Sequence, residues 1–233
     1  MVLQPLGTAT DVTCLPAFRA VSHPAWIEAL IYILAFVYFG AFWTYPSEGG
    51  ASEKMTYLAE NQLSFSLMYF LMYVVFGVFL AVLVVGLFEE LKSTNDPLVK
   101  VGSVFGFVWV VLVIASGMLA NIGLVHAVEL MDLSAEQAFD MWRVVTVIVE
   151  SLGGGNELVG GLWVLLISLA ALKATIFPRG LNYLGISVGC AGVSMIYPAE
   201  VLTEIFGITQ VLWFLWLGVS MLSQRATNKL ADS

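Results

Sequence analysis

The sequence predicts an all-α integral membrane protein: a six-transmembrane-helix bundle with an extra outer amphipathic helix. Composition is the first reason, because 60% of the 233 residues are hydrophobic and only 11% are charged, whereas a soluble domain has about 25% charged residues. The mean hydropathy is +0.92. The second reason is the distribution of the charges, which leaves six windows free of Asp, Glu, Lys and Arg. A spanning helix needs about 17–25 mostly apolar residues, and all but one window meet this length.

Each charge-free window predicts one transmembrane helix. In chain order the windows are 29–47, 61–88, 101–128, 158–172, 180–199 and 205–224. The fourth is short, and we expect Asn156 and Glu157 to form its polar entry, while Lys173 extends toward the headgroups. Ser22 and Pro24 predict the start of the first helix, because both residue types favour helix N-termini.

Positive charge predicts the orientation of the chain. With six spans and both termini in the cytoplasm, seven of the nine Lys and Arg residues lie inside and two, Lys54 and Arg143, lie outside, as the positive-inside rule requires. The sequence thus divides into a cytoplasmic tail (1–24), a membrane domain (25–224) and a second cytoplasmic tail (225–233). The net charge of −8, without a basic patch, gives no indication of nucleic-acid binding.

Residues 134–152 are the one segment that could be counted as a seventh span. Its charged residues recur at helical spacing opposite an apolar face, which indicates an amphipathic helix, and Ser134 with Gln137 forms a capping box at its start. A seventh span would also leave only three positive charges inside against five outside. We therefore expect this helix to lie at the outer surface or to dip partly into the membrane.

The glycine-rich stretch "SLGGGNELVGG" (151–161) raises the question of a ligand loop. A phosphate-binding loop needs a Lys-Ser/Thr pair after its glycines and a strand before them, and this stretch has neither. A turn followed by close helix packing explains the residues better, since small residues let neighbouring helices approach, although a ligand loop stays open as an alternative. The predicted helix-packing glycines are Gly102, Gly106, Gly160, Gly161, Gly185 and Gly189.

Titratable and polar groups gather in the predicted outer half of the protein. The candidate ligand-binding residues are His126, Arg143, Glu150, Asn156, Glu157, Glu200 and Glu204. Carboxylates and an imidazole at one membrane face are suited to a cation or a cationic solute, and the alternative is an ordinary solvated rim. The sequence contains no metal-ligand spacing and no catalytic constellation. We predict no cofactor, and a bound lipid or pigment is compatible with the apolar spans.

The second half of the chain resembles a known family. The stretch "GGLWVLLISLAALKATIFPRGLNYLGISVGCAG", followed by "VLWFLWLGVSMLS", is similar to an uncharacterised prokaryotic family of multi-span membrane proteins, catalogued as a domain of unknown function. The resemblance covers about residues 60–222 and includes the Pro-Arg-Gly-Leu turn at 178–181. It implies a six-helix bundle in a prokaryotic cytoplasmic membrane and no known activity.

Three functions follow as hypotheses. The first is a non-enzymatic subunit or scaffold that acts through helix–helix contacts, either in a homo-oligomer or with other membrane subunits, surrounded by the lipid bilayer. The alternative is a small transporter or binding protein with an acidic outer vestibule for a cation or cationic solute. An intramembrane enzyme that uses His126 is a third and weaker hypothesis.

Overall fold

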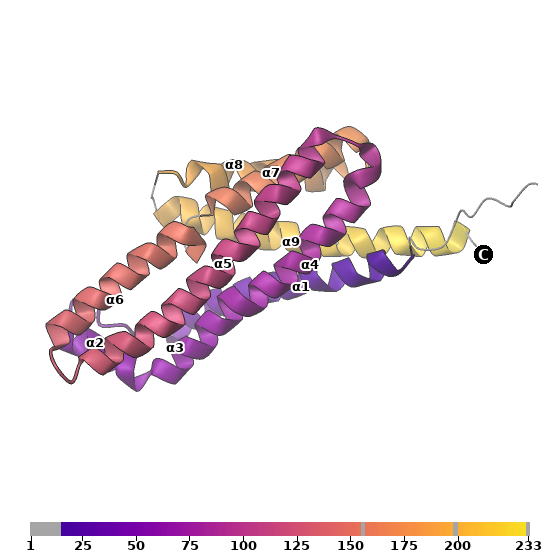
Figure 1. Cartoon of the computed structure of the whole chain (residues 1–233). Coiled ribbons are helices and arrows are strands. Elements are labelled where there is room, and N and C mark those ends of the chain that lie inside the picture. Colours follow the sequence, from indigo (N-terminus) through magenta and orange to yellow (C-terminus); the bar gives the residue numbers. More distant parts are fainter. Residues whose placement is uncertain (1–14, 155–156, 198–199, 232–233) are drawn as a thin grey trace, which may run out of the picture.

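The protein is an elongated bundle of helices (Figure 1). The structure, a computed structural model, describes residues 15–154, 157–197 and 200–231, and within these ranges every regular element is a helix. The elements are α1 (Leu15–Val37), η1 (Tyr38–Phe42), α2 (Ala51–Glu60), α3 (Gln62–Tyr69), η2 (Phe70–Val75), α4 (Phe76–Leu91), η3 (Lys92–Thr94), α5 (Pro97–Leu130), α6 (Ala135–Val149), η4 (Glu150–Gly154), α7 (Leu158–Ala174), α8 (Arg179–Ser194) and α9 (Glu200–Ala231).

Four helical segments of the described chain are long and apolar enough to cross a membrane. They are Ser22–Phe42, Gln62–Thr94, Pro97–Leu130 and Val201–Ser223. They correspond to the first, second, third and sixth predicted spans. The fourth and fifth predicted spans fall in α7 and α8, which are shorter at 17 and 16 residues. The fold is thus the helical fold of a membrane-embedded protein, with four candidate spans of full length.

Helix α5 is the longest element, with 34 residues, and runs diagonally across the bundle in Figure 1. Two shorter helices, α6 and α7, pack along it one after the other. Helix α6 packs on the C-terminal half of α5, where a methyl group added to Gly123 would lie 2.6 Å from the Val145 side chain. Helix α7 packs on the N-terminal half, where Lys173 forms an ion pair with Asp96, the residue before α5. The junction between η4 and α7 therefore lies beside the middle of α5.

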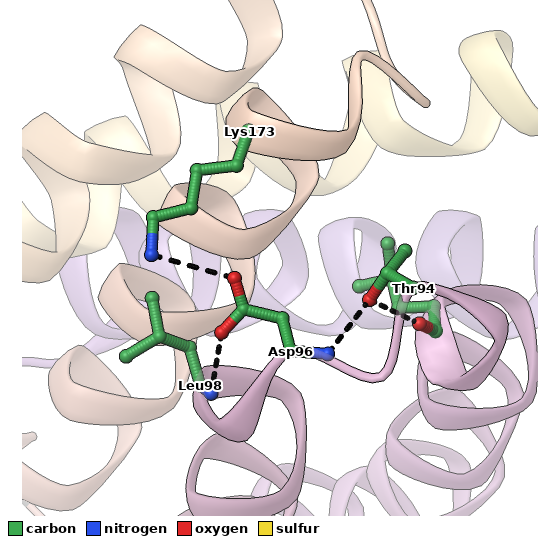
Figure 2. Close-up of polar contacts among 5 residues, drawn as sticks. Thr94, Asp96, Leu98 and Lys173 are labelled. Carbon is green, nitrogen blue, oxygen red and sulfur yellow. Dashed lines mark hydrogen bonds and ion pairs between the residues drawn. The ribbon is translucent and has the colours of Figure 1, made fainter.

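The turn between α4 and α5 shows why α5 begins where it does (Figure 2). Asp96 is the N-cap: its Oδ1 accepts a hydrogen bond of 2.9 Å from the Leu98 backbone N–H, and Pro97 occupies the first helical position, which suits a residue without an N–H. The Lys173 ammonium lies 3.4 Å from Asp96 Oδ2. The pKa of the Asp96 carboxyl is held below its ordinary value, first by the hydrogen bond from Leu98 and then by Lys173.

Helix α1 departs from its predicted start. It begins at Leu15 and continues through Ser22, with Pro24 inside the helix, so the predicted start at these two residues is wrong. A proline inside a helix removes one backbone hydrogen bond and crowds the carbonyl four residues earlier, yet α1 continues through Pro24. Helix α1 packs antiparallel to α9, with Trp26 opposite Gly218 and Phe36 opposite Gly207.

Helix α6 is the predicted amphipathic element. It spans Ala135–Val149, and the Ser134 hydroxyl accepts a hydrogen bond of 3.4 Å from the Gln137 backbone N–H. Its apolar face packs along α5 and buries Trp142, Val145 and Val149, while Figure 1 places it at the end of the bundle opposite the α4–α5 turn. Its position relative to the bilayer stays a prediction.

Candidate functional site

A cavity of about 170 Å³ lies beside the start of α7. The π-helical segment η2 and helices α1, α4, α5 and α9 contribute to its wall. The lining residues are Ile31, Tyr32, Ala35, Phe36, Met72, Tyr73, Phe76, Val113, Glu157, Thr203, Glu204, Phe206 and Gly207. Thr203 and Glu204 are exposed and mark the mouth of this cavity, which we call the acid–aromatic cavity. Its wall is therefore apolar and aromatic, with two carboxyl groups.

Glu157 is the residue that immediately precedes α7. Its Oε2 is buried and has no hydrogen-bond partner among the described residues, and the same is true of Trp109 Nε1. The indole of Trp109 nevertheless lies close enough to act on the Glu157 carboxyl, although the two groups do not reach hydrogen-bond geometry. Gly160 allows this approach, because a methyl group there would lie 2.6 Å from the Trp109 ring. Glu157 thus offers an unpaired carboxyl oxygen beside the cavity.

Aromatic rings form a closed circle next to the cavity. Neighbouring centroids are 5.4–6.2 Å apart, within the range of favourable aromatic pairs. In order, the circle contains Tyr32, Phe76, Trp109, Trp163, Trp213 and Phe214. It joins α1, α4, α5, α7 and α9. The circle therefore fixes the relative positions of helices that line the cavity.

A second cavity of about 240 Å³ adjoins the first and shares Met72 and Tyr73 with it. It is lined by Phe39, Tyr69, Met72, Tyr73, Ala120, Trp142, Thr146, Val149 and Glu150. Tyr69 and Tyr73 follow one another at 6.0 Å between ring centroids. The two cavities together extend from the start of α9 toward α6.

Three π-helical segments border these two cavities. Segment η1 contributes Phe39, η2 contributes Met72 and Tyr73, and η4 contributes Glu150. A π turn inserts an extra residue into a helix and occurs frequently at functional sites. The three segments therefore mark the cavities by their backbone geometry, and no residue pattern in the sequence predicted them.

The structure divides the predicted binding residues into three sets. Glu157 and Glu204, which are 47 positions apart in the chain, line the acid–aromatic cavity, and Glu150 lines the second one. His126 and Arg143 lie elsewhere and are exposed. His126 Nδ1 is 3.0 Å from Glu129 Oε2, and Arg143 Nη1 is 3.6 Å from Asp140 Oδ1. Asn156 and the side chain of Glu200 lie outside the described residues.

The predicted packing glycines lie at contacts between helices. Gly161 of α7 packs against α8, since a methyl group there would be 2.7 Å from Gly192 Cα. Gly189 of α8 packs against α7, since a methyl group there would be 2.5 Å from Leu165 Cβ. Gly185 faces Ser168, Gly160 faces Trp109, and both Gly102 and Gly106 face α7 side chains. All six contacts are made within one chain.

Two buried polar residues were not chosen as candidates from the sequence. Glu28 on α1 and Gln210 on α9 are both 0% exposed, and neither side chain has a hydrogen-bond partner among the described residues. Gln210 lies inside the sixth charge-free window, and Glu28 directly precedes the first one. In the structure, Glu28 lies inside the candidate span Ser22–Phe42. The sequence offered one signal for Glu28: Tyr32 follows it four residues later, on the same helix face.

Comparison with known proteins gives no relative from which a function could be transferred. No family model, no curated protein and no solved structure matches the chain. The resemblance to the uncharacterised prokaryotic family therefore stays an expectation. Among the described residues, no group of three His, Cys, Asp or Glu side chains is placed to hold a metal ion.

Proposed function

We propose that the protein is a small membrane carrier or binding protein for a cationic organic solute, which it holds in the acid–aromatic cavity. The observation that supports this most is the position of Glu157, whose carboxyl has an unpaired oxygen, Oε2, at a cavity walled by aromatic rings. Ligand sites are typically apolar cavities with a few polar groups that fix orientation. An ionisable residue within the membrane is a functional-site hypothesis by default.

The chemistry of the wall favours an organic cation. Carboxyl groups attract positive charge, and the faces of Tyr32, Phe76 and other rings attract cations through their quadrupoles. Quaternary ammonium groups are recognised in this way by aromatic cages. Helix α7 begins beside the middle of α5, next to this site, and interrupted helices at substrate sites are a recurrent feature of transporters.

The membrane topology is part of the proposal. We propose six crossings of a prokaryotic cytoplasmic membrane, with both termini in the cytoplasm and α7 and α8 as the fourth and fifth crossings. The antiparallel packing of α7 on α8 supports this, as does the ion pair of Lys173 with Asp96 at the predicted cytoplasmic end. Cysteine labelling at Ser47, Asn95 and Ser233 tests it: only the first should react from outside.

The subunit or scaffold hypothesis has less support. It rested on glycine faces that were free to contact a partner, and the structure uses these glycines for contacts between α5, α7 and α8 of the same chain. Migration in native gels in mild detergent remains its test. A large stable assembly would favour it over a carrier that acts alone.

Choline is a suitable probe for the proposed site because its charge is permanent and its methyl groups are apolar. In thermal melts of the purified full chain, we expect choline to stabilise the protein, by about 2.7 kcal/mol at a hundred times its Kd. Its neutral isostere 3,3-dimethylbutan-1-ol should have little effect.

The decisive variant is Glu157→Gln, which should lose most of the stabilisation by choline. Glu60→Gln is the matched control, since this exposed acid at the end of α2 lines neither cavity. Equal stabilisation by choline and its isostere would contradict the proposal. So would an unchanged choline response in Glu157→Gln.

A further inference from the structure

A column of buried polar groups leads away from the acid–aromatic cavity. On α1, Glu28 lies one helical turn before Tyr32, which lines the cavity, and residues at this spacing share a helix face. On α9, Gln210 follows the lining residue Phe206 at the same spacing. Because α1 and α9 are antiparallel, both Glu28 and Gln210 lie on the same side of the cavity, away from its mouth.

These groups lack the partners that buried polar groups normally have. Both oxygens of Glu28 and both amide atoms of Gln210 are without a hydrogen-bond partner among the described residues. An isolated charge in such surroundings is very costly, so the Glu28 carboxyl is stable there only with its proton. Retaining such a group within a span is typical of proton relays in pumps and transporters.

Tyr32 connects Glu28 with the cavity. Both Glu28 and Glu157 are close enough to act electrostatically on the Tyr32 hydroxyl, and a phenol can donate and accept a proton. The three groups come from α1 and from the residue before α7. Neither oxygen of Glu28 is hydrogen-bonded among the described residues, so a proton passes between Glu28 and Tyr32 only when these two side chains turn toward one another.

We propose that the protein exchanges its cationic solute for a proton, and that Glu28 and Tyr32 carry this proton between Glu157 and the opposite end of α1. The inference rests on the proposed function. The cation displaces the Glu157 proton toward the cavity mouth as it enters there. After the cation has left toward the opposite side, a proton from the start of the span at Ser22 reaches Glu28, Glu28 gives its own proton to Tyr32, and Tyr32 gives its own to Glu157. In one cycle a positive charge and a proton cross in opposite directions, and all three groups return to their neutral forms.

The helices around Glu28 carry few other titratable groups among the described side chains. Its own helix adds the exposed His23, and η2 adds Tyr73. Helix α4 has no titratable group before Glu89 and Glu90 at its far end. Helix α9 contributes Glu204 at the cavity mouth, while the side chains of Arg225 and Lys229 lie outside the described residues.

The test separates solute exchange from proton exchange in vesicles reconstituted with the full chain. Counterflow of labelled choline against unlabelled choline at equal pH needs no net proton movement. Accumulation of choline driven by an acidic interior needs it. We expect Glu28→Gln to retain choline-dependent thermal stabilisation and counterflow at the wild-type rate, while pH-driven accumulation falls to the level of protein-free vesicles.

Two further variants sharpen the result. Glu28→Asp keeps a carboxyl group and should restore pH-driven accumulation, whereas Glu60→Gln should behave as the wild type. Wild-type accumulation in Glu28→Gln would overturn the relay. Loss of counterflow with choline binding retained would also overturn it, because Glu28 would then act on the conformation. Absence of choline binding in the wild-type protein would instead contradict the proposed function itself.

Discussion

The contact between α7 and α8 and the region around the acid–aromatic cavity use the same apolar composition in opposite ways. Between α7 and α8, glycines bring two backbones together, as at Gly161 and Gly192. Around the cavity, the helices contain π-helical segments and large aromatic rings, which line volumes of about 170 and 240 Å³. Small residues thus remove the space between helices, whereas π turns and rings leave space that a ligand can enter.

The largest expected effect comes from breaking the close contact. Gly161→Ala would place a methyl group 2.7 Å from Gly192 Cα and 2.9 Å from the Val193 nitrogen, so backbone atoms must move. Overpacking of this kind costs about 1–3 kcal/mol, and Gly161→Leu should disrupt folding further. Thermal melts in detergent measure the effect. Gly40→Ala is the matched control, since no atom lies within 4 Å of its added methyl group, and an equal loss in both variants would contradict the packing account.

The next effect concerns the α6 cap. Ser134→Ala removes the hydroxyl that accepts the Gln137 N–H, and loss of such a cap costs about 0.5–2 kcal/mol. Because no residue of α6 lines the acid–aromatic cavity, choline stabilisation measured in the same melts should remain. A Ser134→Thr variant should recover most of the stability. Loss of choline binding in the alanine variant would show that the cavity depends on α6 more than proposed.

A larger side chain should be tolerated at the acid–aromatic cavity, in contrast to the contact between α7 and α8. Ala35 lines the acid–aromatic cavity, so Ala35→Leu can extend its side chain into existing space. Added hydrophobic burial is worth about 0.8 kcal/mol per CH₂, and we expect the free energy of unfolding to stay near wild type or rise slightly. Choline stabilisation should be lost, because its volume is occupied. A strongly destabilised Ala35→Leu variant that still binds choline would contradict the assigned space.

The smallest effect is electrostatic and lies far from the cavity, at the α4–α5 turn. The pKa of Asp96 is lowered by Leu98 and Lys173, so its ionised form stabilises the fold above the unfolded pKa of about 3.9. This contribution is lost as the pH falls through the lower, folded-state pKa. The stability difference between wild type and Asp96→Asn, from melts across acid pH, should therefore be greatest near neutrality and vanish in strong acid. A constant difference would contradict the ionic account.

Much of the helical fold followed from residue patterns, and the reasons for the remaining differences are specific. Charge-free windows predicted helices at all six positions, and Ser134 predicted the start of α6. Pro24 misled the prediction of α1, because a proline suits a helix start but is also tolerated within membrane helices, where neighbouring groups satisfy the freed backbone. Glu28 was left out of the first predicted span for a different reason, since that window was defined by the absence of charged residues.

The candidate site was harder to predict than the helices. The acids were selected because they fell in one predicted half of the membrane, but this criterion cannot separate Glu157 and Glu204, which share a cavity, from His126 and Arg143, which are exposed. Their separation depends on the register of α6 and α7 along α5. The π turns have no residue signature, since they arise from the packing of whole helices.

The central claim is that Glu157 is a protonated carboxyl group that faces the acid–aromatic cavity and exchanges its proton for a cation. Dicyclohexylcarbodiimide, an apolar reagent that modifies protonated carboxyl groups, tests this directly when the adduct is located by mass spectrometry of peptides. We expect modification of Glu157, protection by choline, and no protection by 3,3-dimethylbutan-1-ol. Glu28, which lines neither cavity, should react much less. Modification of Glu157 that choline leaves unchanged, or an unreactive Glu157, would contradict the account.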